Sequence, residues 1–377
     1  MPVRPLWFDA HLDLAFLAVH ARDMTAPLDI NAPPHPPAAL TLPTLRDANC
    51  LAVLATIFTG ADIEGPAGYP AGDVERAYRA GRAQLEAYLT WRDRSLFLLD
   101  LPAALRPDPH VGEIRGGMGV AELVPPSPST ALRQLVKDQR IHAGILMENA
   151  DPIRSPEELP FWKEHGLAAV SLAWATQSRY AGGNSCKTGL TPQGRELITE
   201  LDRLHIMHDV SHLSDASLEE LLTRTSRPVI ASHSNCRALL PTMADGSPNQ
   251  RHLTDETIRE LARRDGVIGL NLYAKFLSPT PDERATIEHA LAHVERVCSI
   301  TGSTRHVGLG SDIDGGFSAE ELPRGIRVHA DLSKLLDGLR ERGWSDEDLD
   351  GFTHANWARY FRTAAAASPR PARAHAD

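Results

Sequence analysis

Eight short apolar runs, separated by segments of helical periodicity, constrain the fold of this chain more than any other feature of its sequence. Each run has the length and the β-branched content of a buried parallel strand. The runs are Leu6–His11, Leu51–Phe58, His142–Glu148, Leu167–Trp174, Ile206–His212, Pro228–His233, Val267–Tyr273 and His306–Asp312. Helical patterns lie between most of them, at Asp73–Trp91, Gln193–Leu204, Ser214–Thr223, Asp255–Arg264, Asp282–Ile300 and Asp346–Arg362. Strand and helix in regular alternation predict an α/β fold, and eight repeats predict a (β/α)8 barrel of the TIM type.

A doubly wound α/β sheet is the main rival, and it predicts a glycine-rich phosphate loop after the first strand. The only Gly-x-Gly, at Gly308 and Gly310, lies in the last run and lacks a third glycine in register. The sequence contains neither a P-loop nor a nucleophile elbow. We therefore predict one barrel domain over residues 1–362, with loop insertions at about 24–47 and 101–130, and a disordered tail at 363–377.

The composition excludes several classes of protein. The chain of 377 residues is 42% hydrophobic and 23% charged, as an ordinary globular protein is. A formal net charge of −10 without a basic run argues against nucleic acid or a membrane surface as a partner. Four cysteines without a C-x-x-C pair, and no signal or membrane segment, favour a cytoplasmic protein. Barrels of this size often pair through their helices, so a homodimer is an open alternative.

Side chains with metal-binding chemistry stand at the ends of most of these runs, where the strands of a barrel meet at one rim. They are His11 with Asp13, Glu148, His212, His233 and Asp312. His11 and Asp13 share a strand face and can reach one ion, while His212 and His233 flank a second position. Glu148, opposite them, is a carboxylate able to bridge two metal ions ~3.5–4 Å apart. Imidazole and carboxylate are the ligands of zinc and related divalent ions.

Each of these residues, taken singly, has a simpler explanation. A lone histidine at a strand end is most often a hydrogen-bonded structural residue, Asp312 can cap a helix, and the segment at Glu148 can begin a helix or a loop. Together they are hard to explain without ions, because burying so many ionisable groups would cost several kcal/mol each. We therefore predict a metal centre, with Asp209 as a candidate to orient an imidazole and His208 as a core or supporting histidine.

Five short motifs, in order along the chain, carry a further signal. They are Asp9-Ala10-His11-Leu12-Asp13, Asp209-Val210-Ser211-His212, Ser232-His233-Ser234, Arg251-His252-Leu253-Thr254-Asp255 and Gly310-Ser311-Asp312-Ile313-Asp314-Gly315. With Asn356-Trp357-Ala358-Arg359-Tyr360-Phe361 near the end, they resemble the membrane (renal) dipeptidase family of the amidohydrolase superfamily, over about Phe8 to Arg362. The resemblance implies a metal-dependent barrel hydrolase with two Zn2+ ions per chain, although another divalent metal remains open.

The resemblance also implies a division of the metal ligands. On the family's template His11 and Asp13 bind one zinc ion, and His212 and His233 bind the other. Glu148 bridges the two ions and is a catalytic residue as well as a ligand.

The remaining implied roles concern the proton and the substrate. Asp312 corresponds to the catalytic acid/base residue, and Arg251 to the arginine that binds the terminal carboxylate of the substrate. The family's dipeptidases have a histidine at the end of the fourth strand, assigned to the scissile carbonyl, where this chain has Trp174. The stretch between His233 and Arg251 is also longer than usual, and residues 240–249 are the excess. We expect both departures to affect the substrate and not the metal centre.

We therefore expect a metallo-dipeptidase, whose partner is a small-molecule substrate. Its reaction would be zinc-dependent hydrolysis of the amide bond of dipeptides or similar small carboxylate-bearing amides, by a metal-bridging hydroxide. Asp312 would take the proton of the water and pass it to the leaving nitrogen. Because Trp174 replaces the family's histidine, the alternative is a related binuclear-zinc amidohydrolase acting on N-acyl-amino acids, lactones or cyclic amides. A metal-binding barrel without catalysis is disfavoured, because Asp312 is present.

Overall fold

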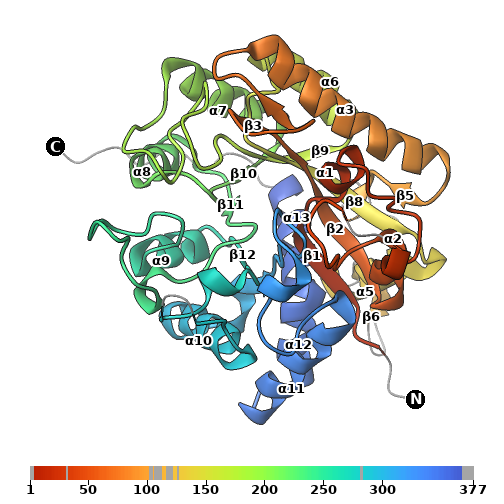
Figure 1. The fold of residues 1–377 in the computed structure, drawn as a ribbon. Coiled ribbons are helices and arrows are strands. Elements are labelled where there is room, and N and C mark those ends of the chain that lie inside the picture. The colour runs from red at the N-terminus through yellow and green to blue at the C-terminus, as the bar shows by residue number, and fades with distance from the viewer. Residues whose placement is uncertain are drawn as a thin grey trace.

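Eight parallel strands form the centre of the molecule, and helices surround them (Figure 1). The structure is a computed structural model that describes residues 4–30, 33–101, 105, 113–115, 122–124, 127–280 and 283–366. The strands follow one another in the order β11-β10-β9-β8-β2-β1-β13-β12. Their bounds are β1 Trp7–Leu12, β2 Cys50–Phe58, β8 Ile141–Glu148, β9 Leu167–Ser171, β10 Met207–Asp209, β11 Val229–Ile230, β12 Ile268–Leu270 and β13 Val307–Leu309.

The two ends of this strand order join and close the barrel. A parallel bridge pairs Ala231, just after β11, with Ile268 in β12. The amide of Ala231 donates to the carbonyl of Val267 at 3.1 Å, and the amide of Gly269 donates to the carbonyl of Ala231 at 2.8 Å. The predicted (β/α)8 barrel is therefore confirmed, and each of the eight apolar runs supplies one of its strands.

The barrel strands are buried along their whole length, because helices cover the outside and side chains fill the inside. All nine residues of β2 are buried, for example. Four short strands lie outside the barrel order, and a fifth, β5, pairs with the start of β8. Their bounds are β3 Gly60–Ala61, β4 Gly68–Tyr69, β5 Phe97–Leu98, β6 Glu113–Arg115 and β7 Glu122–Val124.

The helices begin where the sequence offers capping side chains. Thr191, Ser214 and Thr254 each accept a hydrogen bond from the amide three residues ahead. The α-helices are α1 Leu14–Val19, α2 Leu42–Asp47, α3 Val74–Asp93, α5 Pro128–Leu135, α6 Leu159–Glu164, α7 Pro192–Leu204, α8 Asp215–Arg224, α9 Asp255–Arg263, α10 Ile287–Thr301, α11 Ser333–Glu341, α12 Asp346–Asp350 and α13 Asn356–Ala366. None of the helices in the described parts of the chain has the length and apolar character needed to cross a membrane.

Short helices fill the connections. They are η1 Leu28–Ile30, η2 Val136–Asp138, η3 Pro156–Glu158, η4 Arg237–Leu239, η5 Ala274–Phe276, η6 Thr304–His306, η7 Ala319–Glu321, η8 His329–Leu332 and the π-helix η9 Gly351–Ala355. The last helical segment was expected to be continuous over Asp346–Arg362, but the π-helix divides it into α12 and α13. The helix expected from Asp282 begins at Ile287, because Thr286 and His289 form a capping box there.

The two expected loop insertions have different outcomes. The segment 24–47 contains η1 and α2 and is tied to the rim of the barrel, since the amides of Ala39 and Leu40 donate to Asp314 at 2.7 and 3.0 Å. Most of the segment 101–130 lies outside the described residues. So do residues 367–377 of the expected tail, whereas 363–366 continue α13.

Two glycines allow three strands to meet closely beside this rim. A Cβ atom on Gly269 would lie 1.8 Å from the carbonyl oxygen of Ser232, and a Cβ atom on Gly310 would lie 1.7 Å from the same oxygen. Only glycine fits at these positions. Gly269 and Gly310 thus serve close backbone packing beside Ser232, whereas a Cβ atom on Gly308 would lie 2.4 Å from the indole nitrogen of Trp357.

Candidate metal centre

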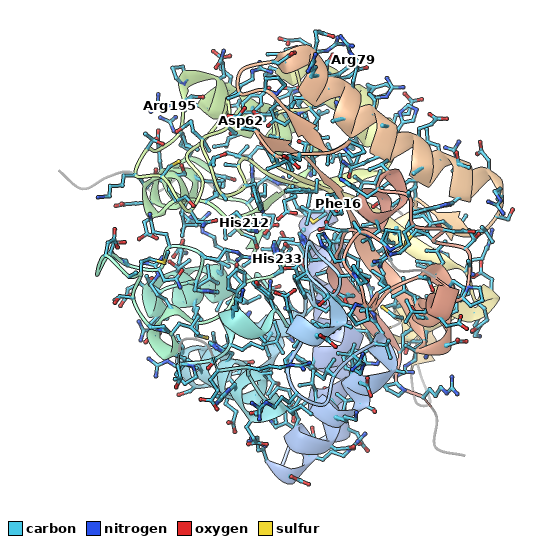
Figure 2. All side chains as sticks on the ribbon, in the orientation of Figure 1. Phe16, Asp62, Arg79, Arg195, His212 and His233 are labelled. Carbon is cyan, nitrogen blue, oxygen red and sulfur yellow. The ribbon has the colours of Figure 1, made fainter. Side chains whose placement is uncertain are left out.

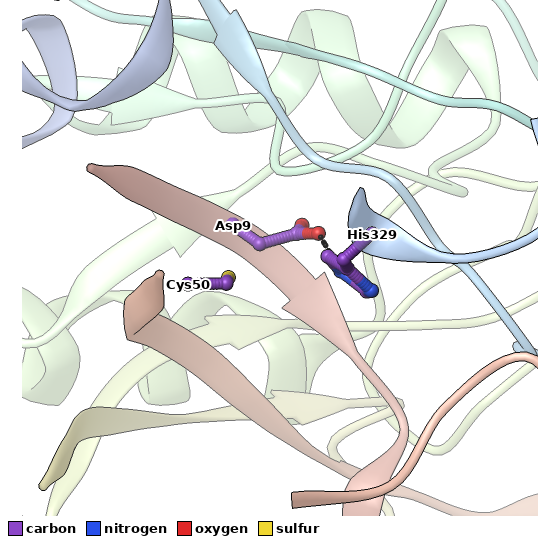
Figure 3. Close-up of side chains that lie close together, drawn as sticks. All are labelled: Asp9, Cys50 and His329. Carbon is purple, nitrogen blue, oxygen red and sulfur yellow. Dashed lines mark hydrogen bonds and ion pairs between the residues drawn. The ribbon is translucent and has the colours of Figure 1, made fainter. Parts of the chain in front are cut away.

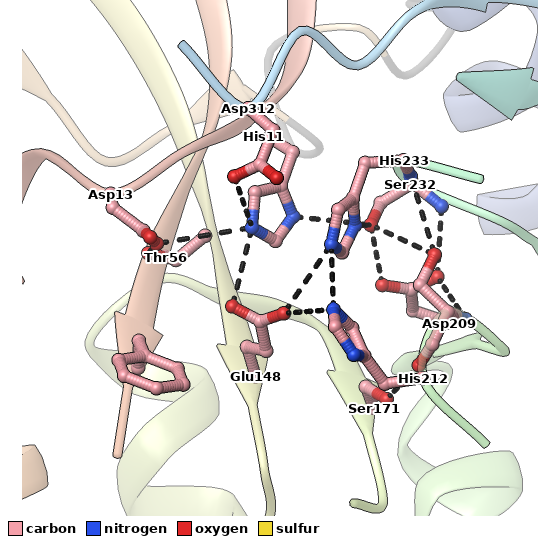
Figure 4. A network of polar contacts seen from close by, with 12 residues as sticks. His11, Asp13, Thr56, Glu148, Ser171, Asp209, His212, Ser232, His233 and Asp312 are labelled. Atoms are coloured by element: carbon pink, nitrogen blue, oxygen red, sulfur yellow. Dashed lines mark hydrogen bonds and ion pairs between the residues drawn. The ribbon is translucent and has the colours of Figure 1, made fainter. Parts of the chain in front are cut away.

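The structure gathers the side chains predicted to bind and use metal ions into one buried cluster at the C-terminal rim of the barrel (Figure 4). They are His11, Asp13, Glu148, His212, His233 and Asp312. Figure 2 shows His212 and His233 near the middle of the molecule, whereas Arg79 and Arg195 project from its periphery.

The sequence predicted that His212, His233 and Asp312 would be the last residues of their strands, but they lie outside the strands. Each stands three residues beyond the last residue of its strand. His212 and Asp312 have positive φ angles of 67° and 59°. A strand cannot contain that left-handed conformation, so the strands end before these residues. The side chains still reach the rim because the chain turns inward there.

Glu148 occupies the centre of the cluster. Its Oε2 lies 3.2 Å from Nε2 of His11. Its Oε1 lies 3.1 Å from Nε2 of His212 and 3.4 Å from Nε2 of His233. The carboxylate thus presents one oxygen to each of two groups of side chains, the arrangement of a bridging ligand.

Two further carboxylates complete the group around His11. Its Nε2 lies 3.8 Å from Oδ1 of Asp13 and 4.0 Å from Oδ1 of Asp312. Thr56 donates a hydrogen bond to Asp13, and the amide of Asn271 donates to Oδ2 of Asp312 at 2.9 Å. Asp312 is therefore held at Oδ2 while its Oδ1 faces the imidazole, whereas Oδ1 of Asp13 both accepts from Thr56 and faces the imidazole.

Burial and crowding shift the pKa values of these acids. Burial, together with the neighbouring carboxylates, raises the pKa of Asp13 to about 6 and that of Asp312 to about 8. Burial also lowers the pKa of His11, but the adjacent Glu148 carboxylate outweighs this effect and raises it to about 10. The cluster thus draws positive charge to the point where the three carboxylates meet.

The other two histidines have the opposite shift. Burial lowers the pKa of His212 to about 4 and holds the pKa of His233 well below its usual range. Both imidazoles are therefore neutral at pH 7, which is the form that binds a metal ion.

The outer nitrogen of each imidazole has a hydrogen-bond partner. Nδ1 of His212 lies 2.9 Å from Oδ1 of Asn184. Ser232 Oγ lies 3.2 Å from Nδ1 of His11 and 2.8 Å from Nδ1 of His233. Ser232 in turn donates to Oδ2 of Asp209 at 2.6 Å. Such partners fix the ring orientation and leave each Nε2 directed at Glu148.

The atoms that face one another in the cluster are ones that bind divalent ions. Because Asn184 accepts from Nδ1 of His212, Nε2 of His212 carries a lone pair, and it lies only 3.0 Å from Nε2 of His233. Two nitrogens that both carry lone pairs cannot hydrogen-bond to each other. Together with the oxygens of Asp13, Glu148 and Asp312, they form a set of ligand atoms that suits cations. The residues fit a pair of divalent ions.

Several supporting residues were not predicted, although some had a signal in the sequence. Thr56 is the one hydroxyl residue in the apolar run of β2. Asn271 directly follows β12, but the predicted strand extended to Tyr273 and concealed it. Asn184 comes from an irregular loop and had no signal. Asp209, predicted to orient an imidazole, lies beneath two of them and contacts them through Ser232.

A cavity of about 350 Å³ opens above this cluster. Apolar side chains form much of its wall, namely Phe16, Phe58, Ile63, Trp174, Phe276 and Phe317. Trp174 lies three residues beyond β9, with its ring centroid 5.0 Å from that of Phe58 and 6.0 Å from that of His212. The indole therefore borders the cavity beside the predicted metal ligands. A larger cavity, of about 820 Å³, is lined by Pro5 and Thr304 at the opposite, N-terminal ends of the strands.

Arg251 lies beside the cluster but is not among the described residues that line the cavity. Its guanidinium donates to the carbonyl of His233 at 2.8 Å and to Oγ of Ser234 at 3.2 Å. The ring of Phe276 covers it, with 5.1 Å between the guanidinium carbon and the ring centroid. Nε of Arg251 is buried and has no hydrogen-bond partner in the described parts of the chain.

Solved structures share this fold over nearly the whole chain. A dipeptidase AC, described as a metallopeptidase of family M19, has a TM-score of 0.75 at 23% identity and covers 96% of this chain and 99% of its own. A metallopeptidase from Rhodobacter sphaeroides, bound to a phosphinate mimic of the dipeptide L-Ala-D-Ala, has a TM-score of 0.73 at 22% identity, over 95% of this chain and 99% of its own.

Relatives by sequence match a shorter part. An uncharacterized dipeptidase of Schizosaccharomyces pombe is 30% identical over 213 residues, which are 55% of this chain and 49% of the relative. The dipeptidase aclJ of Aspergillus oryzae is 29% identical over 209 residues, 54% of this chain and 47% of the relative. The chain thus matches about half the length of these relatives. The profile of the membrane dipeptidase family matches residues 123–374, and the chain belongs to this family, peptidase family M19.

Proposed function

We propose that this protein is a binuclear metallo-dipeptidase, which hydrolyses the amide bond of a dipeptide or a similar small amide that bears a carboxylate. The observation that carries the proposal is the two-sided position of Glu148, with His11 at one oxygen and His212 and His233 at the other. Membership of the membrane dipeptidase family supports the reaction class.

Two divalent ions would bind to the cluster, each to some of its side chains. Zinc is the metal that these ligands suit. His11 and Asp13 would hold one ion, His212 and His233 the other, and Glu148 both. Bound there, the ions would lower the pKa of a water molecule and polarise the amide carbonyl.

Asp312 is the group that would move the proton. Its Oδ1 faces the cluster 4.0 Å from His11, and Asn271 holds its Oδ2. Burial raises its pKa to about 8 in the ion-free protein, and bound cations would favour the ionised carboxylate, the form that can accept a proton. It would accept the proton of the attacking water and deliver it to the leaving nitrogen.

Arg251 would bind the terminal carboxylate of the substrate. Replacing it by methionine, Arg251→Met, should cost ~1.5–3 kcal/mol in kcat/KM for substrates with a free carboxylate, because a charge-assisted contact is lost. A substrate blocked at that carboxylate should lose little. Arg237 offers a matched control, since it pairs with Asp215 outside the cluster, and Arg237→Met should not discriminate between the substrates. Equal losses on both substrates for Arg251→Met would show that Arg251 only supports the backbone at His233.

Trp174 favours a second candidate function within the same chemistry. An indole donates one hydrogen bond and accepts none, and it presents an apolar face to the cavity. Neither Arg179 nor Tyr180 takes over the carbonyl contact, since both bond to the main chain at Ile153 instead. An amidohydrolase acting on N-acyl-amino acids, lactones or cyclic amides would make use of such an apolar wall.

The substitution Trp174→His distinguishes the two candidates. We expect it to shift the preference toward ordinary dipeptides and away from substrates with bulky apolar groups, measured as the ratio of kcat/KM values. Trp344 is similarly half-buried but lies outside the cavity, so Trp344→His should leave the ratio unchanged. An unchanged ratio in Trp174→His, with metal content intact, would mean that the indole only packs.

The direct test of the proposed function is a substrate panel on the purified protein. Dipeptides, N-acyl-amino acids, lactones and cyclic amides are assayed side by side with Zn2+ present. We expect the dipeptides to be hydrolysed fastest. Faster turnover of one of the other classes would select the second candidate, and no turnover of any class would contradict both.

A further inference from the structure

We propose that Asp9, fixed in place by His329, is a positioning residue that holds the backbone of the metal centre on the side of His11 and Asp312. The proposal rests on the proposed function, because it assumes that His11 and Asp312 act there. Asp9 and His329 touch neither the cavity nor the cluster with their own side chains, so their effect would pass through the main chain.

The carboxylate of Asp9 joins the first and last strands of the barrel. Its Oδ1 accepts hydrogen bonds from the amide of His11 at 3.2 Å and from the amide of Ser311 at 2.8 Å. Its Oδ2 accepts from the hydroxyl of Ser311 and lies 3.0 Å from Nε2 of His329. One fully buried side chain therefore connects the backbone at a predicted ligand, His11, to the residue before Asp312.

This connection supports a backbone conformation that is otherwise unfavourable. Asp312 has a φ of 59°, in the left-handed region that residues with a side chain seldom adopt. Asp9 holds Ser311 before it, and the hydroxyl of Ser311 accepts from the amide of Ile313 after it at 3.2 Å. The amide of Asp312 itself donates to the carbonyl of His11 at 3.2 Å. The turn that presents Asp312 is thus fixed on both sides.

A second aspartate repeats this arrangement on the other side of the barrel (Figure 4). Asp209 accepts from the amides of Ser211 and Ser232 at 3.0 and 2.8 Å and from the hydroxyl of Ser232. The residues after these two serines are His212, whose φ is 67°, and His233. In both cases an aspartate on one strand binds the serine that precedes a functional residue just beyond the end of a neighbouring strand. The repetition favours a common role in presenting the site.

His329 distinguishes the two arrangements. It begins η8, a segment outside the barrel strands, and its side chain is fully buried against Asp9 (Figure 3). Its Nδ1 has no partner among the described residues, so the contact with Asp9 is the hydrogen bond that orients the ring. The imidazole thereby supplies the fourth donor to Asp9 and fixes the direction of its carboxylate.

The same residues do not form a second metal site. Ligand atoms of Asp9, Cys50 and His329 lie within 4.8 Å of one another. The four donors around Asp9 already use the acceptor positions of its two oxygens. Burial also holds the pKa of the Cys50 thiol well above its usual range, which disfavours the thiolate that a metal ion would bind.

The test compares His329→Leu with His329→Gln, whose amide can donate to Asp9 in place of the imidazole. Zn2+ affinity is measured by competition with a chelator, and the visible spectrum of the Co2+-loaded protein reports the ligand geometry. We expect His329→Leu to weaken Zn2+ binding about 10- to 100-fold, as loss of a partner behind the ligands does, and to alter the Co2+ spectrum. His329→Gln should restore both.

A matched control separates positioning from general packing. His354 is equally buried and bonds to Ser129 and Thr353, at the side of the larger cavity away from the cluster. His354→Leu should lower Tm but leave Zn2+ affinity and the Co2+ spectrum unchanged. If His329→Leu behaves in the same way, the proposal is overturned.

Two further outcomes are distinguished by one more variant and by the unsubstituted protein. If His329→Leu does not fold, Ser311→Ala removes only the hydroxyl between Asp9 and Ile313, and we expect a lower kcat at an unchanged KM. An unchanged kcat in Ser311→Ala overturns the proposal. If the unsubstituted protein binds neither Zn2+ nor Co2+, the proposed function itself fails, and this inference fails with it.

Discussion

Replacing Asp312 by asparagine is expected to lower kcat by ~10²–10⁴, because the shape of the side chain is kept while the group that carries the proton is lost. Asn271 can still donate to the remaining oxygen of the side chain at position 312. The five ligand side chains are untouched, so the metal content of Asp312→Asn should stay close to that of the unsubstituted protein.

Turnover and metal content must be measured on the same preparation. A large fall in kcat with the metal retained identifies Asp312 as the proton-transfer residue. Full turnover in Asp312→Asn would show that this assignment is wrong. A parallel loss of metal and activity would instead make Asp312 a ligand, which its distance of 4.0 Å from His11 also allows.

Removing the divalent ions with a chelator is expected to abolish turnover and to make stability depend on pH in a particular direction. Without ions, the folded chain holds protons on Asp312, whose pKa is raised to about 8 by burial, and on His11, whose pKa is raised to about 10 by Glu148 against the effect of burial. Unfolding releases these protons above pH 6.5, the ordinary value for histidine. The free energy of unfolding should therefore fall as the pH rises from 6.5 through about 8, the pKa of Asp312, and on to about 10, the pKa of His11.

Below pH 6.5 the free energy of unfolding has no single direction of change with pH, because the lowered pKa values of His212 and His233 act against the raised ones. Above it, the ion-loaded protein should differ from the stripped protein, since bound cations take the place of the protons. Thermal unfolding of both forms at a series of pH values checks this prediction. Parallel curves for the two forms would contradict it.

The barrel was predictable because its strands are buried on both faces and read as continuous apolar runs. The predicted run at Leu51–Phe58 is the clearest case, since it falls within β2 and every residue of β2 is buried. The ends of the strands were less predictable. The local pattern does not reveal that His212 and Asp312 adopt a left-handed backbone, because the conformation depends on the hydrogen bonds of Asp209 and Asp9 to neighbouring strands.

Contacts between distant segments also limit how much of the site the sequence predicts. The residues that would bind metal ions are recognisable by type and position, because the C-terminal ends of all strands converge in a barrel. Their partners are not: Asn184, Asn271 and His329 reach the site or its support from loops far along the chain. Arg251 is the opposite case. Its motif identifies it from the sequence, but the motif does not reveal that its side chain donates to the backbone carbonyl of His233.

The proposed reaction requires two ions, one on each side of Glu148. Elemental analysis of protein purified without chelator, combined with a dipeptide assay of the same sample, tests this directly. We expect about two divalent ions per chain, and we expect His233→Ala to lose metal and turnover together. One ion or none per chain, with full dipeptide hydrolysis, would contradict the bridging position of Glu148.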